Sequence, residues 1–133
     1  MFDTKEELIE FLKKKNFQKR IDKLAKKYAN KKVMIYGAGM GFLAVKENYD
    51  LSKLNIIGIA DKKFDNDGEF MGYKTYTPDS FMSQKPDIEL IGMIDPDIAE
   101  SFFEEELYPE FGKFKHEFLI KLSIFDLIKM LFK

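Results

Sequence analysis

The chain has 133 residues, the length of one domain with a core of its own and short for an enzyme with a separate substrate domain. Its apolar and charged fractions are 45% and 34%, and it contains no cysteine, which excludes disulfides, thiolate catalysis and cysteine-ligated metals. No segment approaches the roughly 18 apolar residues that span a bilayer, and the charged N-terminus does not resemble a secretory signal. We therefore expect a cytoplasmic protein without a transmembrane segment.

Charge is unevenly distributed along the chain. Residues 1–32 hold 11 Lys/Arg against 5 Asp/Glu, a net charge of +6, whereas residues 33–133 hold 11 against 18, a net charge of −7. A basic arm can bind nucleic acid, but the aromatic and arginine residues among these lysines are too few to mark a nucleic-acid surface. We expect a lysine-rich, solvated helix face and no nucleic-acid partner.

The first 32 residues predict a helical extension of two helices. One helix is expected over residues 4–15, because Thr4 and Glu7 form a capping box in front of an apolar periodic segment. Apolar residues at helical spacing predict a second helix over residues 17–30. Residues 1–32 are therefore assigned to this extension.

From residue 33 the pattern becomes that of an α/β domain. Short apolar runs that stop at glycine or aspartate predict buried parallel strands, and a helical pattern follows most of them. The expected strands are 33–36, 55–60, an edge strand at 72–76, 88–94 and a last strand within 113–121. The expected helices are 42–48, one that starts at 77–79, one from 95–97 to about 108, and 123–132. This alternation predicts a small Rossmann-like, mostly parallel sheet with flanking helices for residues 33–133.

A glycine-rich turn joins the first expected strand to its helix. Its residues are Gly37, Ala38, Gly39, Met40 and Gly41. In a dinucleotide-binding turn the first glycine permits the tight turn, the second lets the backbone approach a pyrophosphate, and the third permits close packing of helix and strand. Gly37 and Gly39 occupy the first two places, but the third falls on Phe42. We expect the Phe42 side chain to push the helix from the sheet or to shift its start.

Two aspartates follow the expected strands. Asp61 ends the second strand, 20 residues beyond Gly41, where a carboxylate accepts hydrogen bonds from ribose hydroxyls. Asp95 ends the third main strand, where it either caps the next helix or borders a ligand crevice. The order of strand, turn, helix, strand and Asp61 predicts a nucleotide site. The alternative is that the turn only satisfies backbone geometry and that Asp61 caps a loop.

Three segments together resemble a bacterial domain family. They are Val33–Gly39, Ile56–Asp61 and Gly72–Asp79. In this order they are similar to the Rossmann-like N-terminal domains of polysaccharide-biosynthesis proteins, such as nucleotide-sugar dehydratases and sugar-modifying acyltransferases, over residues 32–108. The resemblance implies binding of NAD or NADP, a CoA-like group or a nucleotide-sugar, with the glycine turn at phosphate and Asp61 at ribose. It also allows a domain that has lost binding and serves assembly.

The same turn has a second resemblance. With Leu43 and Ala44 it is similar to the G-x-G-x-G-Phe-Leu turn of S-adenosylmethionine methyltransferases, which again places Asp61 on the ribose. Ile35 and Tyr36, however, stand where that family has an acidic residue, and the chain is shorter than a seven-stranded methyltransferase. We therefore consider a nucleotide-binding domain, an interaction module with a degenerate pocket, and a reduced methyltransferase, and we predict no catalytic residue.

The C-terminal segment, residues 118–132, is more apolar than a surface helix needs. It either buries against the sheet or docks on another chain or a lipid surface. We expect a homo-oligomer through this helix. No metal site is predicted, because His116 is the single histidine and the acidic segment 61–69 does not fit a calcium loop.

Overall fold

The computed structural model describes residues 2–131, in which six strands form one sheet. The strands are β1 (Val33–Tyr36), β2 (Ile56–Ala60), β3 (Gly68–Phe70), β4 (Tyr73–Tyr76), β5 (Ile88–Ile91) and β6 (His116–Phe118). Their order is β3-β4-β2-β1-β5-β6, and all neighbours are parallel except β3 and β4. The chain runs outward from β1 to one side and then returns to the other side at β5, which is the strand order of a Rossmann-like fold. The predicted α/β class is confirmed.

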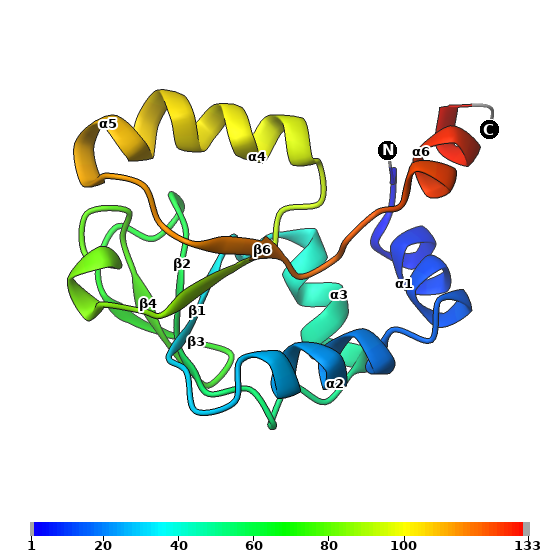
Figure 1. The fold of residues 1–133 in the computed structure, drawn as a ribbon, viewed down its shortest axis with the longest axis horizontal. Helices are drawn as coiled ribbons and strands as arrows, with labels where there is room; N and C mark the ends of the chain where they lie inside the picture. The colour runs from blue at the N-terminus through cyan, green and yellow to red at the C-terminus, as the bar shows by residue number, and fades with distance from the viewer. Residues whose placement is uncertain (1, 132–133) are drawn as a thin grey trace.

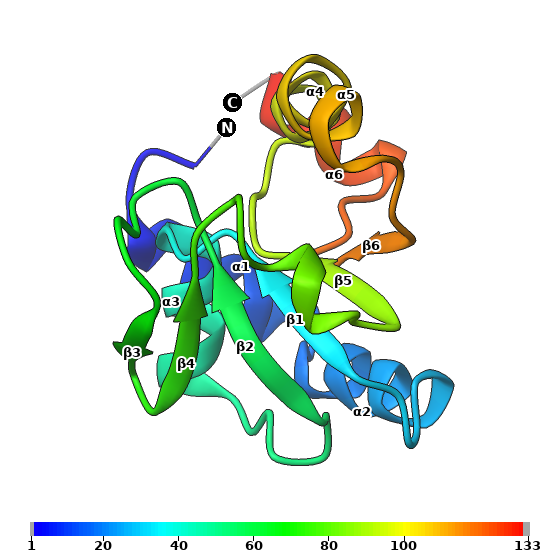
Figure 2. The ribbon, with the colours of Figure 1, turned by 90° about the vertical axis from the view of Figure 1, so that its left-hand side faces the viewer.

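Helices cover both faces of this sheet (Figure 1, Figure 2). They are α1 (Lys5–Lys14), α2 (Gln18–Lys27), α3 (Met40–Asn48), α4 (Pro96–Phe102), α5 (Tyr108–Phe111) and α6 (Ile124–Leu131), with a 3₁₀ turn η1 (Met82–Gln84) and a π-helical segment η2 (Phe103–Leu107). The expected closing helix is present as α6, and residue 132 of that expectation lies outside the described residues. α1 begins as predicted, since the Thr4 hydroxyl accepts a hydrogen bond from the Glu7 N–H at 3.1 Å.

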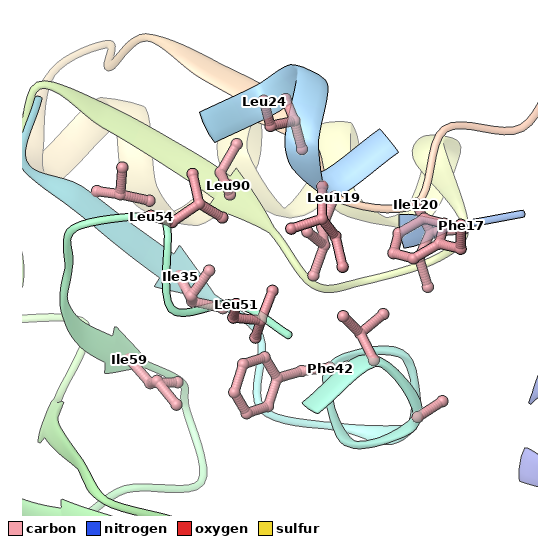
Figure 3. Close-up of a cluster of buried hydrophobic side chains, with 14 of the residues drawn as sticks. Phe17, Leu24, Ile35, Phe42, Leu51, Leu54, Ile59, Leu90, Leu119 and Ile120 are labelled. Atoms are coloured by element: carbon pink, nitrogen blue, oxygen red, sulfur yellow. The ribbon is translucent and has the colours of Figure 1, made fainter. Parts of the chain in front are cut away.

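One face of the sheet packs against α1, α2 and α3. Alternate residues of the strands, such as Ile35 and Leu90, point to this face together with Phe42 of α3 and Leu24 of α2 (Figure 3). The N-terminal helix pair therefore shares an apolar core with the central strands. Glu117 of β6 adds polar contacts between α2 and the sheet.

Glu117 joins α2 to the sheet edge. Its carboxylate accepts hydrogen bonds from Arg20 at 3.0 Å, Lys27 at 2.7 Å and Tyr28 at 2.5 Å. Burial raises the pKa of this carboxyl, but the hydrogen bonds from Lys27 and Tyr28 and the charge of Arg20 outweigh burial and lower the pKa to about 2. The positive charge of the helix pair is thus partly balanced by the sheet.

The opposite face packs against α4 and η2 through an aromatic cluster that includes Tyr36, Phe81 and Phe103. Glu89 of β5 points into this face. It is 1% exposed, and neither carboxyl oxygen has a hydrogen-bond partner among the described residues. Burial raises the pKa of this carboxyl to about 9, so it is protonated at neutral pH.

Three predicted elements differ from the observed ones. The segment 72–76 is not an edge strand: β4 lies between β2 and β3, because Met71 and Gly72 adopt positive φ values and fold a hairpin onto it. The helix expected from 77–79 is only the short η1, since Lys85 adopts a left-handed conformation and a proline follows it. The helix expected from 95–97 continues through η2 and α5 to Phe111.

Candidate functional site

The glycine turn lies at the carboxyl end of β1. Gly37 has a φ of +106°, which side-chain-bearing residues rarely adopt, and its N–H donates to the Ala60 carbonyl at 2.8 Å. The turn is therefore hydrogen-bonded to the end of β2. Gly39 is the N-cap of α3, and the helix starts at Met40.

The place of the third glycine is filled by Gly41. A Cβ atom on Gly41 would lie 2.4 Å from the carbonyl oxygen of Gly92, and one on Gly92 would lie 2.4 Å from that of Gly37. The turn and the loop after β5 thus pack backbone against backbone. Phe42 does not push the helix from the sheet, because its side chain is fully buried in the core beside the central strands (Figure 3).

Asp61 closes the turn from the side of β2. Its Oδ2 accepts the Ala38 N–H at 2.7 Å and its Oδ1 accepts the Lys63 N–H at 2.9 Å. The Lys63 ammonium in turn donates to the Ala38 carbonyl at 2.7 Å. A carboxylate has about four lone-pair positions, so the partly buried Asp61 keeps capacity for another hydrogen bond.

The first turn of α3 retains unused donors. In the described part of the chain, the N–H groups of Gly39, Met40 and Gly41 donate no hydrogen bond. Gly39 is exposed, and a Cβ atom there would meet nothing within 4 Å. Free N–H groups and the positive end of the helix dipole attract anions.

A cleft of about 630 Å³ opens beside the turn. Its residues come from the carboxyl ends of β1, β2 and β5 on one side and from α4 and η2 on the other. They are Tyr36, Gly37, Asp61, Lys62, Met93, Asp97, Ile98, Ser101, Phe102, Glu105 and Glu106. This is the point where the strand order reverses, and open α/β sheets bind ligands there.

Tyr36, the last residue of β1, lines the cleft and has a buried side chain. Tyr36 is 2% exposed, and its hydroxyl has no partner among the described residues. Burial raises the pKa of this phenol well above its ordinary value, and the charges of Asp61, Glu89 and Glu106 add to the effect.

The structure brings together only part of the predicted site. Gly37 and Asp61 line the cleft, and the first turn of α3 lies beside it, but the Ala38 N–H is already bound by Asp61. Asp95 caps α4, where its Oδ1 accepts the Asp97 N–H at 2.9 Å. Asp95 is not among the residues that line the cleft.

Sequence reasoning missed the wall formed by α4 and η2. Its residues Ile98, Ser101, Phe102 and Glu105 are spaced so that they share one helix face. This spacing could have identified the wall from the sequence, because the helix follows β5, the strand at which the strand order reverses. Asp97, which belongs to the helix start predicted at residues 95–97, also lines the cleft.

Comparison of the chain with protein-family models, with curated proteins and with solved structures gives no match. Within residues 2–131, no helix is both long and apolar enough to cross a bilayer. Function is therefore inferred from the turn and the cleft.

Proposed function

We propose that the protein binds a nucleotide at the carboxyl end of its sheet, with a phosphate on the first turn of α3 and a ribose beside Asp61. The observation that carries this proposal is the set of unused N–H groups of Gly39, Met40 and Gly41 at the start of a nine-residue helix. The exposed Gly39 leaves room for a phosphate to approach them. The cleft at the point of strand reversal offers space for the rest of the ligand.

The charges near Asp61 favour NAD or a nucleotide-sugar over NADP. A 2′-phosphate on the ribose would meet the Asp61 carboxylate, and the two neighbouring lysines are already engaged. Lys62 pairs with Glu106, and Lys63 donates to the turn. The proposed role in cell-surface polysaccharide biosynthesis depends on the sequence resemblance alone, and S-adenosylmethionine remains an alternative ligand.

Replacement of Gly39 by aspartate tests the phosphate site. Its φ of −91° is open to any residue, and an N-cap aspartate would accept hydrogen bonds from the N–H groups that we assign to phosphate. We expect the melting temperature of the free protein to be unchanged or slightly higher. The melting-temperature increase caused by millimolar NAD or UDP-glucose should be lost.

Gly39→Asn is the matched control, because it caps the helix without adding a negative charge. It should keep more of the ligand-induced increase than Gly39→Asp. The proposal fails if no nucleotide raises the melting temperature of the wild-type protein, or if Gly39→Asp responds like the wild type.

A second candidate function is assembly through α6. The structure shows that this helix does not bury its apolar residues on the sheet: Phe125 is 73% and Leu131 is 79% exposed. Asp126 is the inward-facing residue, where it accepts the Ser123 N–H at 2.9 Å and pairs with Lys15 at 2.6 Å. We propose that the exposed apolar face, Ile124, Phe125, Ile128 and Leu131, joins two copies of the chain.

Phe125→Lys combined with Ile128→Lys is expected to convert an oligomer to a monomer. Both side chains are largely exposed, so the substitutions should not destabilise the folded monomer. The urea midpoint of the variant should differ from that of the wild type only by the contribution of assembly. Sizing chromatography with light scattering measures the mass. Ile98→Lys, an exposed apolar residue on α4, is the control that should keep the oligomer. A monomeric wild-type protein would contradict this function.

A further inference from the structure

The exposed apolar face of α6 is too small to hold two copies of the chain together by itself. α6 has eight residues, and four of them form this face. A stable interface takes about 800 Å² and roughly 20 to 30 residues from each partner. Two α6 helices that packed only against each other would bury much less. The interface between two copies therefore has to include surface next to α6.

A groove of about 390 Å³ lies between α6 and α1. The two helices lie next to each other (Figure 1), and the Lys15 ammonium pairs with Asp126 at 2.6 Å. The apolar part of the groove is formed by Phe2, Phe11 and Met130. All three side chains are only partly buried, although the two phenyl rings pack together with their centroids 5.2 Å apart. The groove therefore exposes apolar surface that α6 of the same chain does not cover.

The charges around the groove cancel. Three carboxylates and three ammonium groups line it, from Glu7, Glu10, Asp126, Lys14, Lys15 and Lys129. A lipid headgroup or a nucleic acid would need an excess of positive charge there, whereas a neutral apolar side chain does not. Among the described residues, Glu10, Lys14 and Lys129 form no ion pair. In a symmetric contact, these charges of one copy can meet the opposite charges of the other.

We propose that the groove between α1 and α6 receives the apolar face of α6 from a second copy of the chain, with Phe125 as the residue that enters it. The inference rests on the proposed assembly function and names the surface that the helix binds. Phe125 has the largest side chain of this face. In a two-fold dimer each copy supplies one face and one groove, so the contact is made twice. The buried surface then comes closer to what a stable interface needs.

Single cysteines test this contact directly, because the chain has none of its own. Glu10→Cys places a thiol at the groove, and Ile124→Cys places one beside Phe125; both residues are exposed, so the fold should be kept. The two variants are co-expressed and treated with a short bismaleimide. We expect at least about fivefold more covalent dimer than from either variant alone, since neighbouring thiols react at a high effective concentration.

Glu104→Cys co-expressed with Ile124→Cys is the matched control. Glu104 is also an exposed glutamate, but it belongs to η2 on the opposite face of the sheet. This combination should give no more covalent dimer than Ile124→Cys alone. Intact-mass spectrometry distinguishes the mixed dimer from the two dimers of identical chains.

The outcomes separate the groove contact from the assembly function. If the wild-type chain is an oligomer but Ile124→Cys alone gives as much covalent dimer as the mixture, the α6 helices pack on each other, and only the groove contact is overturned. The same holds if the mixture gives no more than the Glu104→Cys control. If the wild-type chain is a monomer by light scattering, both proposals fail. A monomer that sediments with phosphatidylglycerol vesicles would show that a membrane surface covers α6 instead.

Discussion

Gly41→Ser is expected to destabilise the protein by about 2 to 3 kcal/mol, whereas the same substitution at Gly39 changes stability by only a few tenths of a kcal/mol. Exchange of a glycine inside a helix usually raises stability, because it restricts the unfolded chain. At Gly41 the sign reverses, since a Cβ atom would overlap the carbonyl oxygen of Gly92. At Gly39 the new side chain meets no atom and caps α3.

Urea unfolding measures the stability of both variants. Equal m-values would show that their folded and unfolded states are as compact as those of the wild type. Gly92→Ala is a second test of the same contact, because its Cβ atom would overlap the carbonyl oxygen of Gly37. If Gly41→Ser were as stable as the wild type, the turn and the loop after β5 would not be in backbone contact.

The second large effect is a loss of stability at high pH caused by Glu89. Its folded-state pKa is about 9 against an ordinary value of 4.5, so the folded protein holds a proton that the unfolded chain releases. The contribution of Glu89 is fully present below about pH 4.5 and is lost as the pH rises through 9. Between these limits stability should fall by up to about 1.4 kcal/mol per pH unit from this group alone.

Glu89→Gln removes the titration and keeps the shape. The difference in unfolding free energy between Glu89→Gln and the wild type should therefore shift in favour of the variant as the pH rises from 5 toward 9. Glu89→Met should gain more, because it also removes the two carboxyl oxygens that lack partners. Urea titrations across this range, with Glu104→Gln as an exposed control, measure the effect. Parallel curves for wild type and Glu89→Gln would contradict a protonated, buried carboxyl.

Much of the fold could be predicted from local patterns. The buried strands β1, β2 and β5 are short apolar runs that end at glycine or aspartate, and such runs specify a parallel sheet without long-range information. The prediction for Phe42 was wrong, because the place of the third glycine was assigned by counting residues along the sequence. The direction of a side chain around the helix decides the contact, and successive residues differ in direction by about 100°. Gly41 faces the loop after β5 and Phe42 faces the core.

The site was less predictable for a physical reason. The wall of the cleft belongs to α4 and η2, and which side of a helix meets a crevice depends on how it packs on the sheet. The β3–β4 hairpin was missed because β3 is three residues long and mostly exposed, so it lacks an apolar pattern. Glu89 was a visible signal, a single acid within an otherwise apolar strand, but only its burial shows that it lacks a partner.

The closure of the turn by Asp61 has a consequence for the energetics of binding. The Ala38 N–H, the Asp61 carboxylate and Lys63 hold the loop in one conformation before any ligand arrives. A ligand that binds there has no loop to order, so little of its interaction energy is spent on conformational entropy. Association should then be a single fast step with a backbone that is nearly the same in the free and occupied states.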